Sequence, residues 1–137
     1  MLGPKLFLIY INDLPDYIKH SKIRLFADDS IIYRQIKSQN DCLKLQEDLE
    51  AAIQWKQDWL MSFHPDKCKI MNITTKRTPI HFYYNMYGHI LESVNHAKYL
   101  GITISSDLKW NTHIQQTAAK ANKYCDLSAR KGTFDWQ

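Results

Sequence analysis

Two adjacent carboxylates, Asp28 and Asp29, stand in the most informative stretch of the chain. Short, apolar, β-prone segments precede and follow them, at residues 23–26 and 31–33. This pattern predicts a tight β-hairpin with both aspartates at its tip. Carboxylates crowded at one turn repel each other unless a cation lies there, and hard oxygen ligands suit Mg²⁺. The pair therefore indicates a metal site for phosphoryl or nucleotidyl transfer. An exposed turn with two solvated aspartates is the alternative, because Asp is a common turn residue.

Other residues that often bind metals are scattered along the chain. Cys42, Cys68 and Cys125 form no C-x-x-C pair, so they indicate neither a zinc site nor a disulfide framework. A reducing, intracellular setting, nucleus or cytoplasm, is the simpler interpretation. The longest apolar run, residues 6–11, has six residues, far short of the roughly 18 that span a bilayer. It is also too short for the core of a signal peptide, so we expect neither a membrane span nor a signal peptide.

One helix is predicted before the hairpin and another after it. Pro4 suits the first turn of a helix that ends at Pro15, and a polar link follows at residues 16–22. Residues 38–41 form a capping-box pattern that opens a long helix from about residue 41 to 62. We interpret its apolar stripe as a core face under a sheet, with Glu47, Asp48, Glu50 and Lys56 outside it. The stripe consists of Cys42, Leu45, Leu49, Ala52, Ile53, Trp59 and Leu60.

The second half of the chain is rich in predicted strands. They lie at residues 69–74 and 80–86, followed by a pair at 90–94 and 99–104. A last helix begins near Asn111, and its apolar face carries Ile114, Ala118, Ala121 and Cys125. At 137 residues the chain is one domain by length. The mixed order of elements predicts an α+β fold, an antiparallel sheet with helices on one face.

Several blocks of the sequence resemble one family in the family's own order. Phe26-Ala27-Asp28-Asp29 resembles the catalytic aspartate motif of reverse transcriptases, in the form typical of non-LTR (LINE-like) retrotransposons. Residues 2–15 are similar to the helix before that motif, and 59–69 to the segment with the family's lysine. Residues 99–102 resemble the primer-grip hairpin, and 110–114 the start of the thumb. The resemblance covers residues 2 to about 123, and the last dozen or so match nothing.

The resemblance implies a fold and an activity. Residues 1–106 would form part of the polymerase palm, and 107–137 the start of a helical thumb. The reaction would be RNA-directed DNA synthesis by two-metal nucleotidyl transfer, with Mg²⁺ or alternatively Mn²⁺ as cofactor. The partners would be an RNA template, a DNA primer and dNTP, with no indication of oligomeric state. Asp28 would be the main metal ligand and Asp29 the supporting one. Lys67 would act on the departing pyrophosphate, or it is simply a surface lysine after a helix.

The resemblance also implies contacts with the primer. Phe26 and Ala27 would lie beside the primer terminus, and Tyr99, Leu100 and Gly101 would form a turn against the primer backbone. Otherwise these last three are a buried strand with a glycine bulge. Lys109, Lys120 and Lys123 would line the thumb near the duplex. Residues 67–137 carry ten Lys and Arg against four Asp and Glu, whereas 1–66 carry eight against ten. This distribution suits phosphate contact, with ordinary solubilising charge as the alternative.

In the family, a third aspartate on an adjacent strand completes the metal site, and it precedes the segment that corresponds to residue 1. The template loop and the nucleotide-binding fingers precede it as well. We therefore expect this chain to be inactive alone. The alternative is a catalytically dead remnant that binds nucleic acid without sequence preference. A stand-alone Mg²⁺ phosphohydrolase would leave the other blocks unexplained. Family patterns usually have Asn where this chain has His64.

Overall fold

The computed structural model describes residues 3–27, 29–59 and 64–130. Strands β1 (Lys22–Phe26) and β2 (Asp29–Tyr33) pair antiparallel, with Phe26 opposite Asp29. The predicted hairpin is therefore confirmed, but Asp29 is the first residue of β2 rather than a turn residue. The connection consists of Ala27, whose φ is 49°, and Asp28, which lies outside the described residues. Ala occupies a left-handed conformation here because a two-residue hairpin turn requires positive φ.

The N-terminal helix is split in two. Helix α1 (Gly3–Ile11) ends before Pro15, and α2 (Leu14–Tyr17) has that proline in its first turn. The prediction that Pro15 ends one continuous helix is wrong, because its fixed φ suits the start of a new helix. Asp13 lies between the two helices, and its Oδ1 accepts a hydrogen bond from the buried Trp55 indole N–H at 2.9 Å.

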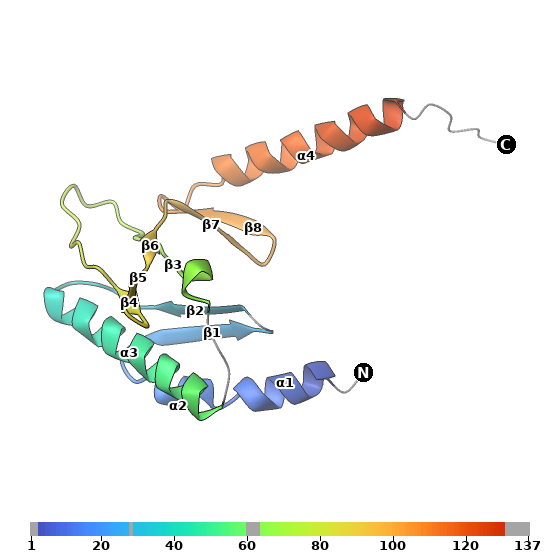
Figure 1. The fold of residues 1–137 in the computed structure, drawn as a ribbon. Coiled ribbons are helices and arrows are strands. Elements are labelled where there is room, and N and C mark those ends of the chain that lie inside the picture. Colours follow the sequence, from blue (N-terminus) through green and yellow to red (C-terminus); the bar gives the residue numbers. More distant parts are fainter. Residues whose placement is uncertain (1–2, 28, 60–63, 131–137) are drawn as a thin grey trace.

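Helix α3 (Gln39–Asp58) opens with the predicted capping box, since the Ser38 N–H donates to Asp41 Oδ2 at 3.0 Å. It lies with α1 and α2 on one side of the β1–β2 hairpin (Figure 1). Its buried residues include Cys42, Leu49 and Ala52 of the predicted stripe, but also Trp55, Asp48 and Lys56. The placement of Asp48 and Lys56 outside the stripe was wrong. Trp59 is exposed, and residues 60–62 of the predicted helix lie outside the described residues.

Short strands form the second half of the fold. A one-turn helix, η1 (Pro65–Lys67), precedes β3 (Lys69–Ile70), which pairs in parallel with β6 (Glu92–Ser93). Strands β4 (Asn85–Met86) and β5 (His89–Ile90) form an antiparallel pair. The predicted strands at 69–74 and 80–86 thus shrink to two residues each.

The last strands pair differently from the prediction. Strand β7 (His96–Tyr99) pairs with β8 (Ile102–Ser105), whereas we expected 90–94 to pair with 99–104. Leu100 and Gly101 have φ of 49° and 82°, which closes a two-residue turn and fixes this register. The described residues contain four separate two-stranded pairs in place of one antiparallel sheet, so the α+β class holds but the single sheet does not.

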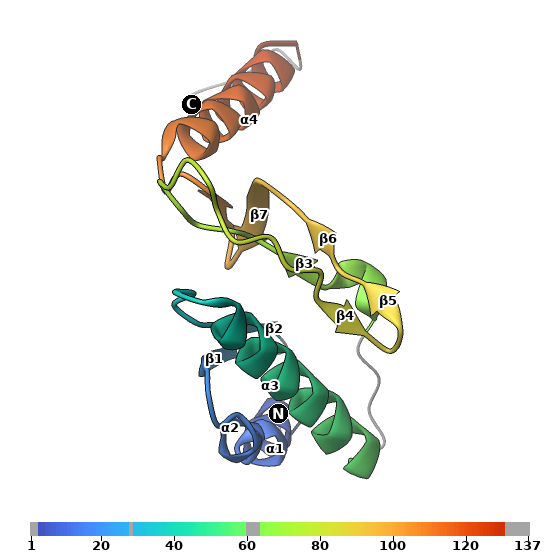
Figure 2. The ribbon, with the colours of Figure 1, turned by 90° about the vertical axis from the view of Figure 1, so that its left-hand side faces the viewer.

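Two clusters of buried side chains hold the elements together, and Ile32 of β2 packs against both. One cluster joins α1, α2 and α3 through Leu14 and Trp55. The other joins α3 to β4 through Cys42 and Met86. Helix α4 (Asn111–Arg130) projects away from both, as Figures 1 and 2 show. Within the described ranges, no helix has the length and apolar character needed to cross a membrane.

Candidate active site at the β1–β2 hairpin

Phe26 and Asp29 lie side by side at the end of the hairpin. They are cross-strand partners, so their side chains share one face of the strand pair. Both are exposed, and Ala27 beside them is exposed as well. The alternation of the strand sends Ile23 and Leu25 to the opposite face, where they pack on the α1–α3 cluster. One face of the hairpin is therefore apolar and packs on the helices, and the opposite face is exposed and carries the Asp29 carboxylate at its end.

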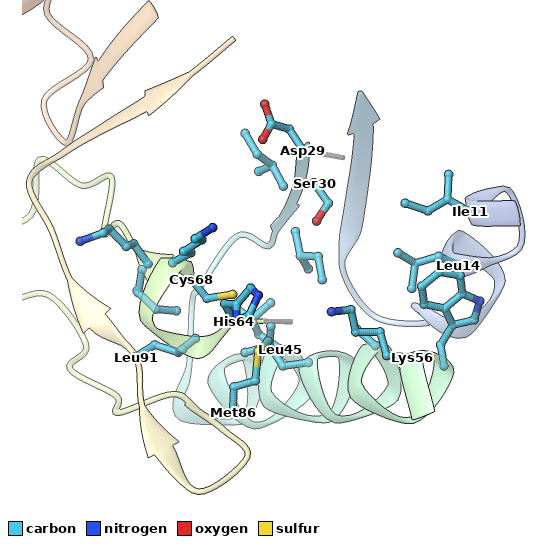
Figure 3. Close-up of a pocket in the computed structure, with 18 residues that line it drawn as sticks. Ile11, Leu14, Asp29, Ser30, Leu45, Lys56, His64, Cys68, Met86 and Leu91 are labelled. Atoms are coloured by element: carbon cyan, nitrogen blue, oxygen red, sulfur yellow. The ribbon is translucent and has the colours of Figure 1, made fainter. Parts of the chain in front are cut away.

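A pocket of about 580 Å³ lies beside β2, and it brings together residues from distant parts of the chain. Asp29, His64 and Lys67 all line it, as do residues of α3 and β3 (Figure 3). Lys67 lies in η1, where its backbone N–H donates to the His64 carbonyl at 3.0 Å. Two of the three predicted catalytic residues thus border one space, together with the histidine that replaces the family's usual Asn.

The described residues do not complete a metal site by themselves. None of their His, Cys, Asp and Glu side chains gather in a group of three or more that could hold a metal ion. Asp29 is an exposed carboxylate that belongs to no such group, and Asp28 lies outside the described residues. A divalent ion at this hairpin would need Asp28 and at least one further oxygen ligand from elsewhere.

The predicted primer-contacting turn is present in β7–β8. Leu100 and Gly101 form the turn, Leu100 is 44% exposed, and Tyr99 is half-buried. The alternative of a strand with a glycine bulge is therefore wrong. This hairpin lies across β1–β2 from the helices α1 to α3 (Figures 1 and 2). It contributes nothing to the lining of the pocket.

The three predicted thumb lysines are exposed, Lys109 before α4 and Lys120 and Lys123 on it. Hydrogen bonds tie the start of α4 to β8. The Thr103 N–H donates to His113 Nδ1 at 3.2 Å, and the Thr103 hydroxyl donates to Gln116 Oε1 at 2.6 Å. These contacts fix where the helix leaves the strand pair.

Asp107 organises the loop that leads into α4. The Ser105 hydroxyl donates to its Oδ1 at 2.7 Å and the Lys109 N–H at 3.0 Å. These hydrogen bonds, the one from Ser105 first, hold the pKa of Asp107 below its usual value. Its carboxylate is therefore engaged in the turn.

Comparison with known proteins decides the family. The family described as "Reverse transcriptase (RNA-dependent DNA polymerase)" matches residues 1–104. The chain belongs to this family.

The relatives of this reverse transcriptase chain are polymerases of mobile elements from Drosophila melanogaster, in agreement with the resemblance to non-LTR retrotransposons. It is 29% identical to "RNA-directed DNA polymerase from mobile element jockey", with 83% of the chain and 13% of the relative covered. It is 27% identical to "Probable RNA-directed DNA polymerase from transposon BS", covering 88% and 14%. The chain thus spans about one seventh of these relatives. No solved structure matches it.

Sequence reasoning did not place Lys56 at the pocket of this reverse transcriptase chain. Lys56 is buried and lines the pocket opposite β2. Burial lowers its pKa from 10.5 to about 8. The sequence spacing could have indicated this burial, because Lys56 follows Ala52 by four residues and Leu49 by seven, which places all three on one helix face.

Proposed function

We propose that this chain is part of an RNA-directed DNA polymerase whose catalytic carboxylates are Asp28 and Asp29 and whose active-site lysine is Lys67. One observation carries the proposal: Asp29, at the tip of the hairpin with the Phe-Ala-Asp-Asp motif, and Lys67, 38 positions later in the chain, border the same pocket. The substrates would be an RNA template, a DNA primer and dNTPs, with Mg²⁺ or Mn²⁺ bound at the carboxylates.

The division into palm and thumb belongs to the same proposal. Residues 1–106 form part of the palm and 107–137 the start of the thumb. The turn at Leu100 and Gly101 contacts the primer backbone together with Phe26 and Ala27. Backbone strain in this exposed turn supports the proposed primer contact. Leu100 is held at positive φ, and such strain is frequent at functional sites. Lys109, Lys120 and Lys123 contact phosphates of the duplex.

The metal site of this proposal is shared with residues from elsewhere in a longer protein. Asp28 and Asp29 supply two carboxylates, and a third comes from a strand that lies next to the hairpin. Two features support this arrangement. Among the described residues, β2 pairs only with β1. In addition, the pocket leaves space beside β2.

Primer extension tests the proposal. The isolated chain should not extend a primer, because the carboxylates of its described residues do not gather into a metal site and misplacement of a reacting group by about 1 Å costs roughly 10²-fold in rate. A graft that joins it to the preceding polymerase segment of the jockey relative should synthesise DNA on an RNA template when Mg²⁺ is present. In that graft, Asp28→Asn should abolish extension. Lys67→Ala should slow the chemical step while duplex affinity stays unchanged.

Asp58→Asn, on the exposed end of α3, is the matched control and should extend like the parent graft. Extension by the isolated chain, or full activity of the Asp28→Asn graft, would contradict the assignment. A graft that binds duplex but extends nothing would instead favour a catalytically dead remnant.

A further inference from the structure

Helix α4 is hydrogen-bonded to the β7–β8 hairpin through its first two turns. Thr112, His113 and Gln116 make these bonds, whereas the side chains of residues 114–125 are exposed. Figure 2 shows the helix leaving the hairpin from this end. Lys123 lies ten residues beyond His113, about 15 Å along the helix axis. A small rotation at the attached end therefore displaces the lysines farther along the helix.

The bond between His113 and Thr103 uses a backbone donor at the edge of β8. Tyr99 and Ile102 are paired next to the turn, and Thr103 follows opposite Lys98. Hydrogen-bonded and non-bonded positions alternate along an antiparallel pair, so the Thr103 N–H points away from β7. Nδ1 of His113 accepts it at 3.2 Å. This bond gives the edge donor a partner and holds α4 against β8.

The same bond depends on the protonation state of His113. A backbone N–H can only donate, so Nδ1 must be unprotonated and the ring proton must lie on Nε2. An imidazolium carries a proton on both nitrogens and would turn one donor toward another. The neighbouring bonds lack this dependence. The Thr112 hydroxyl, 3.2 Å from His96 Nε2, can donate or accept, and the bond from Thr103 to Gln116 contains no titratable group.

The charged groups around this joint leave a cation on His113 without an acidic partner. Strand β8 and the first turn of α4 have no acidic residue. The titratable groups of the other packed elements are His96 and Lys98 on β7 and Asp107 and Lys109 in the loop before α4. Hydrogen bonds, the one from Ser105 first, hold the pKa of Asp107 below its usual value, so its carboxylate stays charged from pH 8 to pH 5. The ion pairs among the described residues do not include His113.

We propose that His113 is a positioning residue that holds α4 on β8 only while Nδ1 is unprotonated. The helix is released as pH falls through the range in which imidazoles gain a proton, about pH 8 to pH 5. The β7–β8 hairpin stays paired, because the Thr103 N–H is not part of its ladder. If Lys120 and Lys123 contact the duplex, the same proton regulates that contact, and this consequence alone rests on the proposed function.

NMR of the full chain tests the proton and the helix separately. At pH 8 the ring ¹⁵N signals of His113 should show the proton on Nε2, and the residual dipolar couplings of α4 and β7–β8 should fit one orientation. At pH 5 the protection of the Thr103 amide from hydrogen exchange should fall roughly tenfold, since one hydrogen bond is lost. The couplings of α4 should then average separately from those of the hairpin.

Two substitutions separate the hydrogen bond from the titration. His113→Asn places a carbonyl oxygen near the position of Nδ1 and does not titrate, so α4 should stay docked at both pH values. His113→Leu removes the acceptor, so α4 should be released at both. His96→Asn is the matched control. It should keep the pH dependence of the parent chain, because the partner of His96 is a hydroxyl.

Duplex affinity measures the regulatory consequence. The parent chain and His113→Asn should bind a primer–template duplex equally at pH 8, and His113→Asn should bind roughly fivefold more tightly at pH 5. Charge alone predicts the opposite order, because only the parent gains a positive charge at this position and positive charge strengthens phosphate binding.

A proton on Nδ1 at pH 8, a Thr103 amide whose protection ignores pH, or a helix that stays docked in His113→Leu would each overturn the proposal. Release of α4 in His113→Asn at pH 8 would overturn it too. Equal duplex affinity of the parent and His113→Asn at pH 5 would refute the regulation. Absence of duplex binding by every variant would count against the thumb assignment instead, because the NMR measurements contain no nucleic acid.

Discussion

Asp48 shows how a charged side chain serves the interior of this protein. It is 2% exposed, and its Oδ1 accepts the backbone N–H of Lys19 at 2.9 Å while Oδ2 accepts that of His20 at 3.1 Å. These two donors belong to the link between α2 and β1. The carboxylate therefore joins α3 to the chain entering the hairpin, and it replaces water for two backbone groups.

Replacing Asp48 by Ala should destabilise the fold by about 2 kcal/mol, because two backbone donors lose their acceptor. Asp48→Asn should cost less, since the amide oxygen still accepts one hydrogen bond. Urea unfolding followed by circular dichroism measures both changes. Glu47→Ala, exposed on the neighbouring position, is the control. An Asp48→Ala variant as stable as this control would show that water takes over the role of the carboxylate.

Asp41, at the start of α3, makes the stability of the fold depend on pH. The Arg34 guanidinium donates to its Oδ1 at 2.8 Å, and with the N–H groups of Lys37 and Ser38 it holds the pKa of Asp41 well below its usual range. Because the pKa is lower in the folded than in the unfolded chain, this stabilisation is complete above an unfolded value of about 4. It is lost as pH falls further.

The urea midpoint of Asp41→Asn should therefore lie below that of the parent at pH 7, and the difference should shrink from about pH 5 to pH 3. Arg34→Gln removes the largest cause of the low pKa, so it should reproduce the same trend. A difference that stayed constant over this pH range would refute the linkage between Asp41 and Arg34.

At the scale of elements, the β1–β2 and β7–β8 hairpins both carry strain in their turns. Ala27 in β1–β2 and Leu100 in β7–β8 have φ of 49°, which costs about 1–2 kcal/mol for a residue with a side chain. Asn and Gly are the usual residues at such positions.

Leu100→Asn should stabilise the β7–β8 hairpin by about 0.5–1 kcal/mol, because Asn tolerates positive φ and Leu100 is 44% exposed. Thermal unfolding measures the change. If Leu100 contacts the primer as proposed, the same variant should weaken duplex binding. Gly101→Ala is the opposite control. Its φ is 82° and its added Cβ meets nothing within 4 Å, so any loss of stability comes from backbone strain alone.

At the scale of the whole molecule, charge is separated along the chain and in space. The net charge is +4, and the exposed lysines of α4 lie on a helix that projects from the two cores (Figure 1). If α4 contacts the duplex as proposed, it can do so without movement of the packed elements. Such contact is independent of base sequence and weakens as salt rises.

The logarithm of the affinity for a primer–template duplex should fall linearly with the logarithm of salt concentration, and Lys120→Ala with Lys123→Ala should reduce the slope by up to about 1.8. Fluorescence anisotropy between 50 and 200 mM salt, with scrambled duplex sequences, measures both properties. The control pair Lys37→Ala and Lys44→Ala removes the same charge near the start of α3. Salt-independent affinity, or an equal change in the control pair, would remove α4 from the interface.

The sequence by itself determined the features that depend on neighbouring residues. The hairpin around Asp28 and Asp29 and the capping box of α3 follow from local sequence patterns. The Leu100-Gly101 turn was implied by the resemblance alone, since the residue pattern predicted a continuous strand at 99–104. The motif also determined the family, because residue types at short spacing identify it. Helix ends and strand lengths were less predictable. Pro15 is compatible with both the end and the start of a helix, and strands of two residues such as β3 have almost no periodicity.

Only the tertiary structure decided which distant segments meet. It placed Lys67 on the same pocket as Asp29, paired β3 in parallel with β6, and rotated α3 so that Asp48 and Lys56 face inward. Charge alone predicts that both side chains face water. Their burial depends instead on partners far along the chain, namely the backbone donors of residues 19 and 20 for Asp48 and the walls of the pocket for Lys56. Such partners become visible only when the segments have packed.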